Sequence, residues 1–364
     1  MWMQRALALA EGAVGLSDPN PRVGCVIVAA DGHTLLGEGH TQAAGSAHAE
    51  VMALQGAQAA GRDVRGATAH VTLEPCSHHG RTPPCCDALI AAGLGRVVVA
   101  VGDPNPAVNG QGAARLRAAG IQVDWAQAAL AEASRELNIG FFSRMQRGRP
   151  WVRMKLAASL DGRTALENGQ SQWITGEAAR TDGHAWRKRA GASLTGVGTV
   201  LADNPRLDVR LVPTPRQPLR CVVDAWLHTP ATARLFDVAD APVLFYAAEP
   251  EATRVATLLA RGAEVCALPD GRGRVDLAAV LADLARRQIN ELHLEAGQRL
   301  NAAWLRAGVV DELLLYQAPL LVGAGQGLAA LGAYAALTEA SRWRYQAIDR
   351  IGPDLRLLLR PALG

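Results

Sequence analysis

The spacing of one histidine, one glutamate and two cysteines constrains this chain more than any other feature. His48 and Glu50 stand two residues apart, and Cys76 and Cys85 follow later, Cys76 directly after Pro75. One imidazole and two thiolates can hold a tetrahedral Zn²⁺ and leave its fourth position open for water, as in catalytic zinc sites. Any fold of this chain should therefore bring His48, Cys76 and Cys85 to one point, with Glu50 beside them as a proton carrier.

The pattern H-x-E…P-C resembles that of the zinc-dependent nucleobase deaminases. In that chemistry, zinc-bound hydroxide attacks an amidine carbon of a heterocycle and ammonia leaves. Side chains two apart on a helix face different sides. The resemblance to the deaminases implies that a helix start enters the site, so that His48 and Glu50 share one pocket. We also expect Pro75 to place Cys76 at a helix start, where free N–H groups stabilise a thiolate. The alternatives are a structural zinc, or a His-Ala-Glu triplet without function.

The gap between the two cysteines narrows the choice of deaminase. Eight residues separate Cys76 from Cys85, whereas deaminases of cytidine or tRNA adenosine carry P-C-x-x-C. Gly80 and the Pro83-Pro84 pair indicate a tight, stiff loop that returns the chain to the metal. Residues 72–85, T-L-E-P-C-S-H-H-G-R-T-P-P-C, strongly resemble the deaminase half of the bifunctional riboflavin-biosynthesis enzymes.

This resemblance implies deamination of 2,5-diamino-6-(ribosylamino)-4(3H)-pyrimidinone 5'-phosphate. It also implies a substrate pocket that includes Asn20, His78, Arg81 and Asn105. Asn20 and Asn105 are equally ordinary turn residues next to proline, so both interpretations stay open. One position departs from the family pattern: where a His is usual, this sequence has Thr41, with His40 beside it.

Length and composition favour two domains and argue against several partners. A chain of 364 residues is long for one domain.

The net charge is only +3 and aromatic residues make up 4%, which argues against nucleic acid as a partner. The sequence contains no apolar run of about 18 residues, so we expect no membrane span. Six scattered cysteines do not resemble a disulfide framework, so we expect a cytoplasmic protein. The oligomeric state stays open, a homo-oligomer included.

Strand and helix patterns alternate along both halves, which predicts the α/β class for each. In residues 1–145 we expect a zinc-dependent deaminase domain with the three-layer α/β/α fold of cytidine deaminases. Its strands should lie near 23–28, 67–73, 96–101 and 121–124, and its helices near 48–60, 86–92, 111–119 and 127–138. A break into Arg, Gly and Pro at 143–150 predicts a linker. Residues 150–364 begin a new series, with strands at 152–156, 193–197, 220–223, 243–246, 291–294 and 312–316.

Three segments of the second half resemble the reductase half of the same bifunctional family. They are M-K-L-A-A-S-L-D-G-R-T at 154–164, S-Q-W-I-T at 171–175 and G-V-G-T-V-L-A-D-N-P-R-L at 196–207. The resemblance implies a fold like dihydrofolate reductase. Gly196 and Gly198 lack the third glycine of a dinucleotide fingerprint, so the usual Rossmann motif is absent.

The family pattern implies NADPH bound by dispersed segments and a phosphorylated substrate. The implied cofactor residues are Ala157, Ser171, Trp173, Thr199, Asp203, Ala225 (by its backbone) and a turn of Gly297, Gln298, Arg299, Leu300, Asn301, Ala302 and Ala303. The implied substrate residues are Arg187, Arg206, Leu207, Arg210 and Glu295, with arginines suited by charge and geometry to a phosphate. Lys155 is the candidate for proton transfer or imine formation, with Glu295 second. Each Arg, and Lys155, could instead be solvated surface.

The leading hypothesis is therefore a bifunctional enzyme of riboflavin biosynthesis. Its first half would be a hydrolase, a Zn²⁺ deaminase with one metal per chain, and its second half an NADPH-dependent oxidoreductase. The second would reduce the ribosyl group of 5-amino-6-(5-phosphoribosylamino)uracil to the ribityl product. A tRNA or nucleoside deaminase with an unrelated second domain is the runner-up, and the eight-residue gap argues against it. A zinc-stabilised binding protein is the third hypothesis, and the intact Glu50 argues against it.

Overall fold

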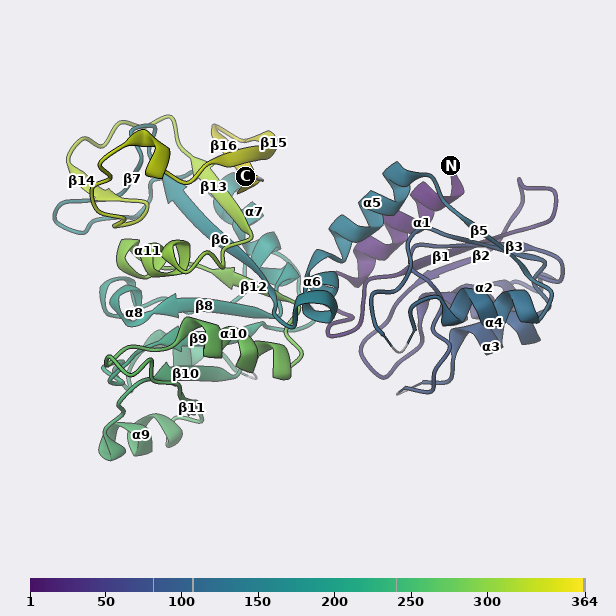
Figure 1. Cartoon of the computed structure of the whole chain (residues 1–364), viewed down its shortest axis with the longest axis horizontal. Coiled ribbons are helices and arrows are strands. Elements are labelled where there is room, and N and C mark those ends of the chain that lie inside the picture. Colours follow the sequence, from purple (N-terminus) through teal and green to yellow (C-terminus); the bar gives the residue numbers. More distant parts are fainter. Residues whose placement is uncertain (81, 107, 240, 363–364) are drawn as a thin grey trace. The chain divides into compact units, whose positions relative to one another are not determined.

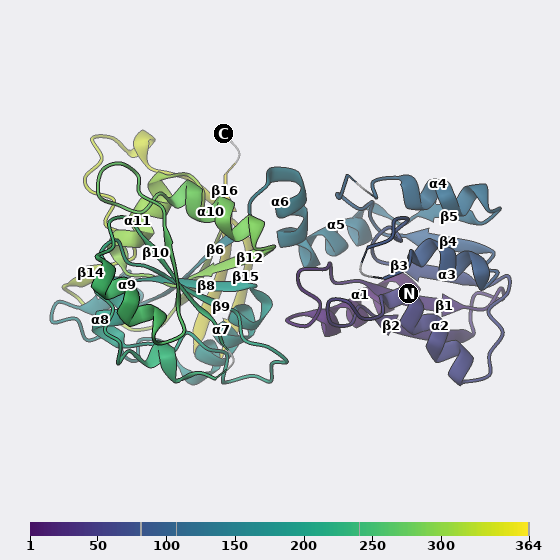
Figure 2. The same ribbon diagram turned by 90° about the horizontal axis from the view of Figure 1, so that it is seen from below.

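The computed structural model describes residues 1–80, 82–106, 108–239 and 241–362. The chain separates into two compact units, Met1–Arg149 and Pro150–Gly364. Each unit is an α/β structure with its own sheet and its own buried core (Figures 1 and 2). The mixed α/β class predicted for both halves is confirmed.

The first unit is built on a five-stranded sheet with the order β2-β1-β3-β4-β5. Strand β1 is antiparallel to β2 and β3, whereas β3, β4 and β5 are parallel. The strands are β1 Gly24–Val28, β2 Leu35–His40, β3 Thr68–Val71, β4 Arg96–Val99 and β5 Gln122–Trp125. The helices are α1 Trp2–Ala10, η1 Glu11–Ala13, α2 Ala49–Ala59, α3 Cys85–Ala91, α4 Gln111–Ala118, α5 Ala128–Leu137 and α6 Ile139–Arg147.

Helices cover both faces of this sheet, so the unit has three layers (Figure 1). All five residues of β1 are buried, as expected for a strand packed on two sides. Cys25 and Ile27 face the cluster that includes Ala53 of α2. The alternate residues Val26 and Val28 face the cluster that includes Met3 of α1 and, at its edge, Leu130 of α5.

The second unit is built on a nine-stranded sheet with the order β11-β10-β9-β8-β12-β6-β13-β16-β15. The strands from β11 to β13 are parallel, and β16 and β15 are antiparallel. The strands are β6 Trp151–Ala158, β8 Ala192–Gly196, β9 Leu219–Val223, β10 Val243–Ala247, β11 Glu264–Ala267, β12 Glu291–Leu294, β13 Glu312–Gln317, β15 Trp343–Ile351 and β16 Asp354–Pro361; β7 Arg163–Leu166 and β14 Gly325–Gly327 pair separately. The helices are α7 Glu177–Arg189, α8 Val197–Asp203, η2 Arg234–Asp237, α9 Ala252–Leu259, α10 Leu277–Arg286, α11 Gln298–Arg306 and η3 Leu337–Glu339.

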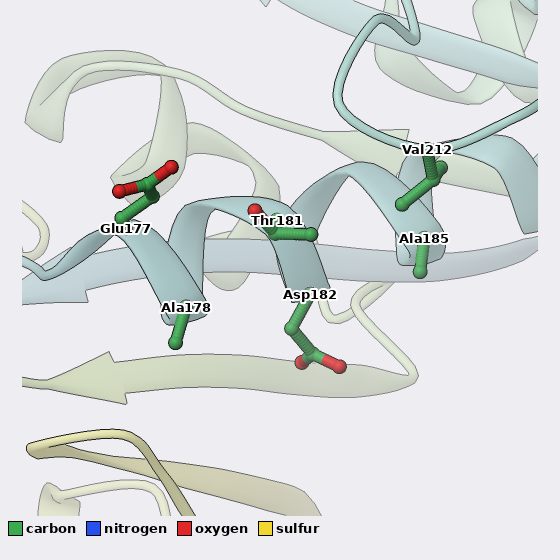
Figure 3. Close-up of a pocket in the computed structure, with 6 residues that line it drawn as sticks. All are labelled: Glu177, Ala178, Thr181, Asp182, Ala185 and Val212. Atoms are coloured by element: carbon green, nitrogen blue, oxygen red, sulfur yellow. The ribbon is translucent and has the colours of Figure 1, made fainter.

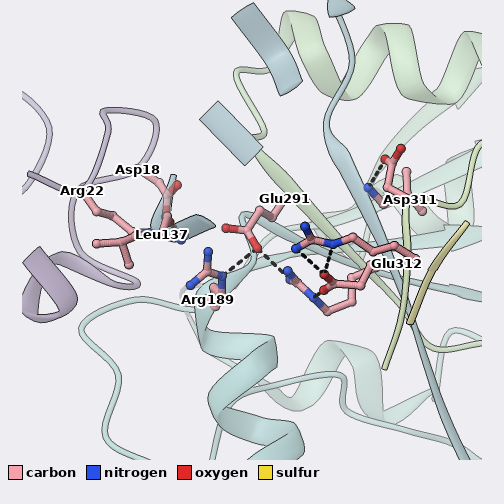
Figure 4. Close-up of polar contacts among 10 residues, drawn as sticks. Asp18, Arg22, Leu137, Arg189, Glu291, Asp311 and Glu312 are labelled. Carbon is pink, nitrogen blue, oxygen red and sulfur yellow. Dashed lines mark hydrogen bonds and ion pairs between the residues drawn. The ribbon is translucent and has the colours of Figure 1, made fainter. Parts of the chain in front are cut away.

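The central strands of this sheet have one apolar face and one charged face, both buried. On the apolar face, Met154 of β6 and Leu294 of β12 pack with Trp304 of α11. On the other face, Arg153 of β6 donates to Glu312 of β13 (2.5 Å) and to Glu291 of β12 (2.7 Å). Figure 4 shows Glu291 and Glu312 among polar side chains that contact them. Removing one partner from such a buried ion network leaves an uncompensated charge, which costs about 3–5 kcal/mol.

Helix α7 lies over this charged face. The Arg153 guanidinium stacks 4.4 Å from the centroid of the Trp186 ring. Arg189, in the last turn of α7, donates to Glu291 at 2.9 Å. A Cβ added to Gly183, in the middle of α7, would lie in ordinary van der Waals contact with Cε of Lys155 of β6 (3.9 Å). The charged strand residues are therefore enclosed rather than solvated.

Several elements differ from the expectations. The segment predicted as a linker is helical up to Arg147, and the helix ends at Gly148, which has the left-handed conformation (φ 66°) that glycine adopts readily. The helix after the zinc loop begins at Cys85, not at Cys76. The β15–β16 hairpin was not predicted. Among helices in the described ranges, none combines the length and apolarity needed to cross a bilayer.

Candidate active sites

The first site begins at the N-terminus of α2. His48 is the N-cap residue, with an extended backbone (φ −79°, ψ 168°), and Glu50 lies in the first helical turn. Because His48 stands outside the helix, the rule that residues two apart face different sides does not apply to this pair. Glu50 is 3% exposed and in hydrogen-bonding contact with Cys85. The expected entry of a helix start into the site is what the structure shows.

The two cysteines reach His48 from the loop after β3 and from the start of α3. Nδ1 of His48 lies 3.1 Å from Sγ of Cys85 and 3.7 Å from Sγ of Cys76. The backbone N–H of Cys85 donates to Sγ of Cys76 at 3.3 Å. The expectation of a helix start at Cys76 was wrong, because Cys76 precedes the loop. Its sulfur nevertheless receives a free N–H from a helix start, that of α3.

The three donors fit a tetrahedral zinc. Their ligand atoms all lie within 4.8 Å of one another. With Zn–S bonds of about 2.3 Å and Zn–N bonds of about 2.0 Å, neighbouring ligand atoms lie about 3.5 Å apart, and the observed N–S separations are close to that. Nε2 of His48 lies 3.4 Å from Oγ1 of Thr82. A metal-ligating His commonly donates its other N–H to an oxygen, so Thr82 is a further site residue that sequence reasoning missed.

Burial and the sulfurs set the protonation of this site. Burial, and after it the charge of Cys76, raises the pKa of Glu50 to about 7. A hydrogen bond from Cys85 and the nearby His48 lower the pKa of Cys76 to about 4, although burial opposes them. A buried carboxyl that titrates near neutrality can both accept and return a proton, which is what a general acid–base catalyst needs.

Glu74 was also missed by sequence reasoning, although it directly precedes Pro75 and Cys76. Its carboxylate is 3% exposed and accepts the backbone N–H groups of Asp103 (3.3 Å), Gly110 (3.0 Å) and Ala113 (3.0 Å). These contacts hold the loop that carries Asn105 against the zinc-binding loop. No sequence pattern signals them, since they join residues about thirty to forty positions apart.

The other predicted substrate residues of this unit lie in loops. Asn20 is half-buried in the segment before β1, and His78 is exposed in the loop between the two cysteines. Arg81 lies outside the described residues. Thr41, which replaces the family's usual His, is buried, and its hydroxyl bonds to the backbone of Val23 (Val23 N at 3.3 Å and Val23 O at 3.4 Å). This threonine therefore serves the fold rather than offering a polar group to a ligand.

The second site centres on Glu295, just after β12. Arg187 of α7 donates to Oε1 of Glu295 at 2.7 Å, and Nζ of Lys155 lies 3.7 Å from Oε2. Burial raises the pKa of Glu295, but Arg187, His293 and Lys155 outweigh it and hold this pKa well below the usual 4.5. Glu295 is therefore a carboxylate, and not a proton donor, at neutral pH, which leaves Lys155 as the candidate.

The three predicted phosphate-binding arginines meet at Asp208, which sequence reasoning missed. Its carboxylate, 3% exposed, lies 2.6 Å from Arg210 and 3.1 Å from Arg206. Its backbone carbonyl accepts from Arg187 at 2.6 Å. Leu207 is buried in an apolar cluster with a left-handed backbone (φ 55°), so only its backbone could contact a ligand.

Several predicted cofactor residues lie together near the start of α11. Oγ of Ser171 donates to Asp203 at 3.4 Å. Thr199, in α8, lies beside Gly297, since an added Cβ on Gly297 would be 3.8 Å from its hydroxyl. Gly297 is the N-cap of α11. A helix start with free N–H groups suits the phosphates of a dinucleotide, so these residues fit NADPH.

The structure corrects parts of the cofactor prediction. The segment expected as a turn is the first turns of α11, comprising Gln298, Arg299, Leu300, Asn301, Ala302 and Ala303. Asn301 and Ala302 are buried, and the Asn301 amide donates to Ala296 O and Leu328 O. The amide nitrogen of Asn301 is therefore used by the fold, whereas its Oδ1 is buried without a partner among the described residues. The carbonyl of Ala225 already accepts from Ala248 N and Glu249 N.

Of two further predicted cofactor residues, one is exposed and the other is half-buried. Trp173 is 64% exposed, and the Arg180 guanidinium stacks 4.5 Å from its ring centroid. Ala157 is half-buried on β6, opposite Tyr316 of β13.

A cavity of about 640 Å³ lies along α7 (Figure 3), lined by Glu177, Ala178, Thr181, Asp182, Ala185 and Val212. It contains none of the predicted site residues.

These features define an enzyme with two sites. One site is a zinc-type ligand set with a buried glutamate, and the other is a charged cluster beside a helix start of the kind that binds dinucleotides. The enzyme is a deaminase joined to a reductase. Residues 1–101 match the model of the cytidine and deoxycytidylate deaminase zinc-binding region. Residues 150–357 match that of the RibD C-terminal domain.

Whole-chain relatives make the assignment specific. The chain is 44% identical to the riboflavin biosynthesis protein RibD of Escherichia coli, over 98% of both chains. It is 39% identical to the solved Acinetobacter baumannii RibD, with a TM-score of 0.88 over 100% of this chain and 98% of that one. The chain belongs to the RibD family, whose members deaminate and then reduce an intermediate of riboflavin biosynthesis, with Zn²⁺ and NADPH as cofactors.

A third relative carries both activities in its description. The chain is 32% identical to a Thermotoga maritima protein described as a diaminohydroxyphosphoribosylaminopyrimidine deaminase/5-amino-6-(5-phosphoribosylamino)uracil reductase. The TM-score is 0.87 over 99% of this chain and 98% of that one.

Proposed function

We propose that residues 1–145 deaminate 2,5-diamino-6-(ribosylamino)-4(3H)-pyrimidinone 5'-phosphate and that residues 150–364 reduce the resulting 5-amino-6-(5-phosphoribosylamino)uracil. The observation that carries the proposal is the pairing of two built sites in one chain, the His48–Cys76–Cys85 ligand set with Glu50 and the Lys155–Glu295–Arg187 cluster. The named activities of the T. maritima relative, which matches nearly the whole chain, support the choice of substrates.

In the deaminase half, Glu50 moves the protons. Zinc supplies Lewis-acid activation of the attacking water when it is bound by His48, Cys76 and Cys85. The Glu50 carboxylate accepts a proton from that water and returns it to the amine as the C–N bond breaks, which yields ammonia. Asn20, His78, Arg81 and Asn105 are the proposed substrate contacts. The contacts of Glu74 support the placement of Asn105 beside the zinc loop.

In the reductase half, Lys155 supplies the proton. NADPH provides hydride when it is bound near Thr199, Gly297 and the start of α11. The Lys155 ammonium donates to the ribose ring oxygen as the C1'–O bond breaks and an iminium forms at C1'. The hydride that bound NADPH would supply to C1' would then give the ribitylamino product, with one proton and one hydride consumed. Oε2 of Glu295 lies 3.7 Å from Nζ of Lys155 and orients this side chain.

The charge of the second site suits a phosphate ester. Lys155, Arg187, Arg206 and Arg210 carry four positive charges, and Glu295 and Asp208 carry two negative ones, which leaves a net charge of +2. A phosphate monoester carries about −1.5 to −2 at pH 7. Burial lowers the pKa of the neighbouring His184 to about 3, so it adds no charge.

The direct test uses the zinc-loaded chain and the diaminopyrimidine ribosyl phosphate. We expect ammonia release first and NADPH oxidation afterwards, both from one preparation. NADPH oxidation without ammonia would contradict the order of the two steps, and ammonia without NADPH oxidation would contradict the reductase assignment. Formation of inosine in tRNA instead would favour the nucleoside deaminase hypothesis.

Two further properties belong to this proposal. All six cysteines are free thiols, which supports a reducing compartment such as the cytoplasm. We also propose that the chain forms a homo-oligomer, and sedimentation at assay concentration measures the state directly.

A further inference from the structure

One buried titratable side chain of the second unit has no role in the mechanism so far. His293 lies in β12, fully buried, two residues after Glu291 and two before Glu295. Its strand neighbours are Arg153 on β6 and Ser193 on β8. Because alternate residues of a strand share a face, its ring lies on the charged face between the Arg153 network and the reductase site.

The surroundings of His293 keep its ring neutral. Burial lowers its pKa, and Arg187 and Arg153 lower it further, whereas Glu295 opposes them. A neutral imidazole carries one N–H, and an ionised carboxylate can only accept. Nε2 of His293 lies 3.3 Å from Oε1 of Glu295. Neither ring nitrogen makes a hydrogen bond of good geometry to the residues the structure describes, and Nε2 is the one that faces a carboxylate within ion-pair distance. The single proton is therefore best placed on Nε2, toward Glu295.

The two oxygens of Glu295 are divided between different partners. Oε1 contacts Arg187 from α7 and His293 from within β12, whereas Oε2 faces Lys155. A carboxylate held through one oxygen by a single arginine could still rotate about its last bond. We propose that His293 is a positioning residue of the reductase half, whose Nε2–H fixes Oε1 so that Oε2 stays aimed at Lys155. This inference rests on the proposed role of Lys155 in the reduction.

Two substitutions separate a positioning role from simple core packing. His293→Leu fills the space without a donor, and His293→Gln restores an N–H at a similar reach. We expect His293→Leu to lower kcat of the reduction about tenfold, as for a lost hydrogen bond to a charged group. KM for NADPH should stay within about twofold, and His293→Gln should recover most of kcat. Equal loss in both variants would overturn the proposal.

The chain offers two internal references. Ser193→Ala changes the neighbouring buried side chain, whose Oγ has no partner among the described residues, and should leave the reduction unchanged. The deaminase activity of the same chain should be unchanged in every variant. A loss in Ser193→Ala equal to that in His293→Leu would show that the effect is packing, and would sink the proposal.

A spectroscopic measurement tests the proposal without any turnover. In ¹⁵N-histidine-labelled wild-type protein, the His293 signals are those absent from His293→Gln. We expect the neutral Nε2–H form throughout the range from about pH 6 to 8. A charged ring or the Nδ1–H form would overturn the positioning role even if reduction proceeds. Absence of NADPH oxidation in wild type, with the Nε2–H form present, would instead contradict the proposed function.

Discussion

The backbone N–H of Ala113 donates to Oε1 of Glu74 at 3.0 Å, which anchors the first turn of α4 to the residue before Pro75. Next to this contact, Gly112 lies so close to the zinc loop that an added Cβ would stand 2.1 Å from the carbonyl oxygen of Pro75. The packing of α4 and the position of Cys76 are therefore coupled through backbone atoms.

Gly112→Ala should consequently damage the zinc site. The methyl group would force Pro75 and Cys76 away from α4, and overpacking of this kind costs about 1–3 kcal/mol. We expect a lower melting temperature for the first unit, weaker zinc retention and at least tenfold slower deamination, with reduction unchanged. Gly56→Ala in α2 is the matched control, because its Cβ would meet nothing closer than 3.6 Å. Equal effects in both variants would refute the coupling.

Glu50→Gln should separate metal binding from catalysis. The amide keeps the shape of the buried side chain but cannot accept the proton of the attacking water, and loss of a general base typically costs 10²–10⁴-fold in rate. We expect deamination to fall by about that range while zinc content, measured by metal analysis, stays near one per chain. Reduction of separately supplied 5-amino-6-(5-phosphoribosylamino)uracil should continue. Loss of both activities would argue against two independent sites.

Lys155→Ala should slow the reduction and spare the deamination. Without the ammonium group facing Glu295, the opening sugar has no proton donor, and we expect the reduction to slow by about 10²–10⁴-fold. Deamination should be unchanged. Lys188→Ala is a close control, since Lys188 is the other lysine of the chain and lies in α7. Undiminished reduction in Lys155→Ala would exclude Lys155 as the donor.

The stability contributed by Glu295 should depend on pH in a defined direction. Its pKa is lowered by folding, since Arg187, His293 and Lys155 outweigh burial. A carboxyl with a depressed folded-state pKa stabilises the protein fully above its unfolded value of 4.5, and this contribution is lost as the pH falls through the lower folded value. The difference in melting temperature between wild type and Glu295→Gln should be largest above about pH 5 and shrink on acidification. A difference that is constant or grows in acid would contradict this linkage.

The sequence by itself determined the features that rest on short patterns. The zinc-type ligands and Glu50 stand in a motif with defined spacing, and the buried strands of both units were evident because runs such as Gly24–Val28 are apolar on both faces. The family resemblance added Lys155, Glu295 and the arginines.

Only the tertiary structure decided which distant side chains meet. Glu74 holds backbone groups up to 39 positions away, Asp208 unites arginines from α7 and from its own loop, and His293 faces Glu295 from inside the sheet. In the sequence alone, Glu74 is a glutamate before a proline, Asp208 is an aspartate among arginines, and His293 is a histidine in an apolar strand. Their roles depend on burial and on partners brought together by strand order, and neither burial nor strand order is encoded in local spacing.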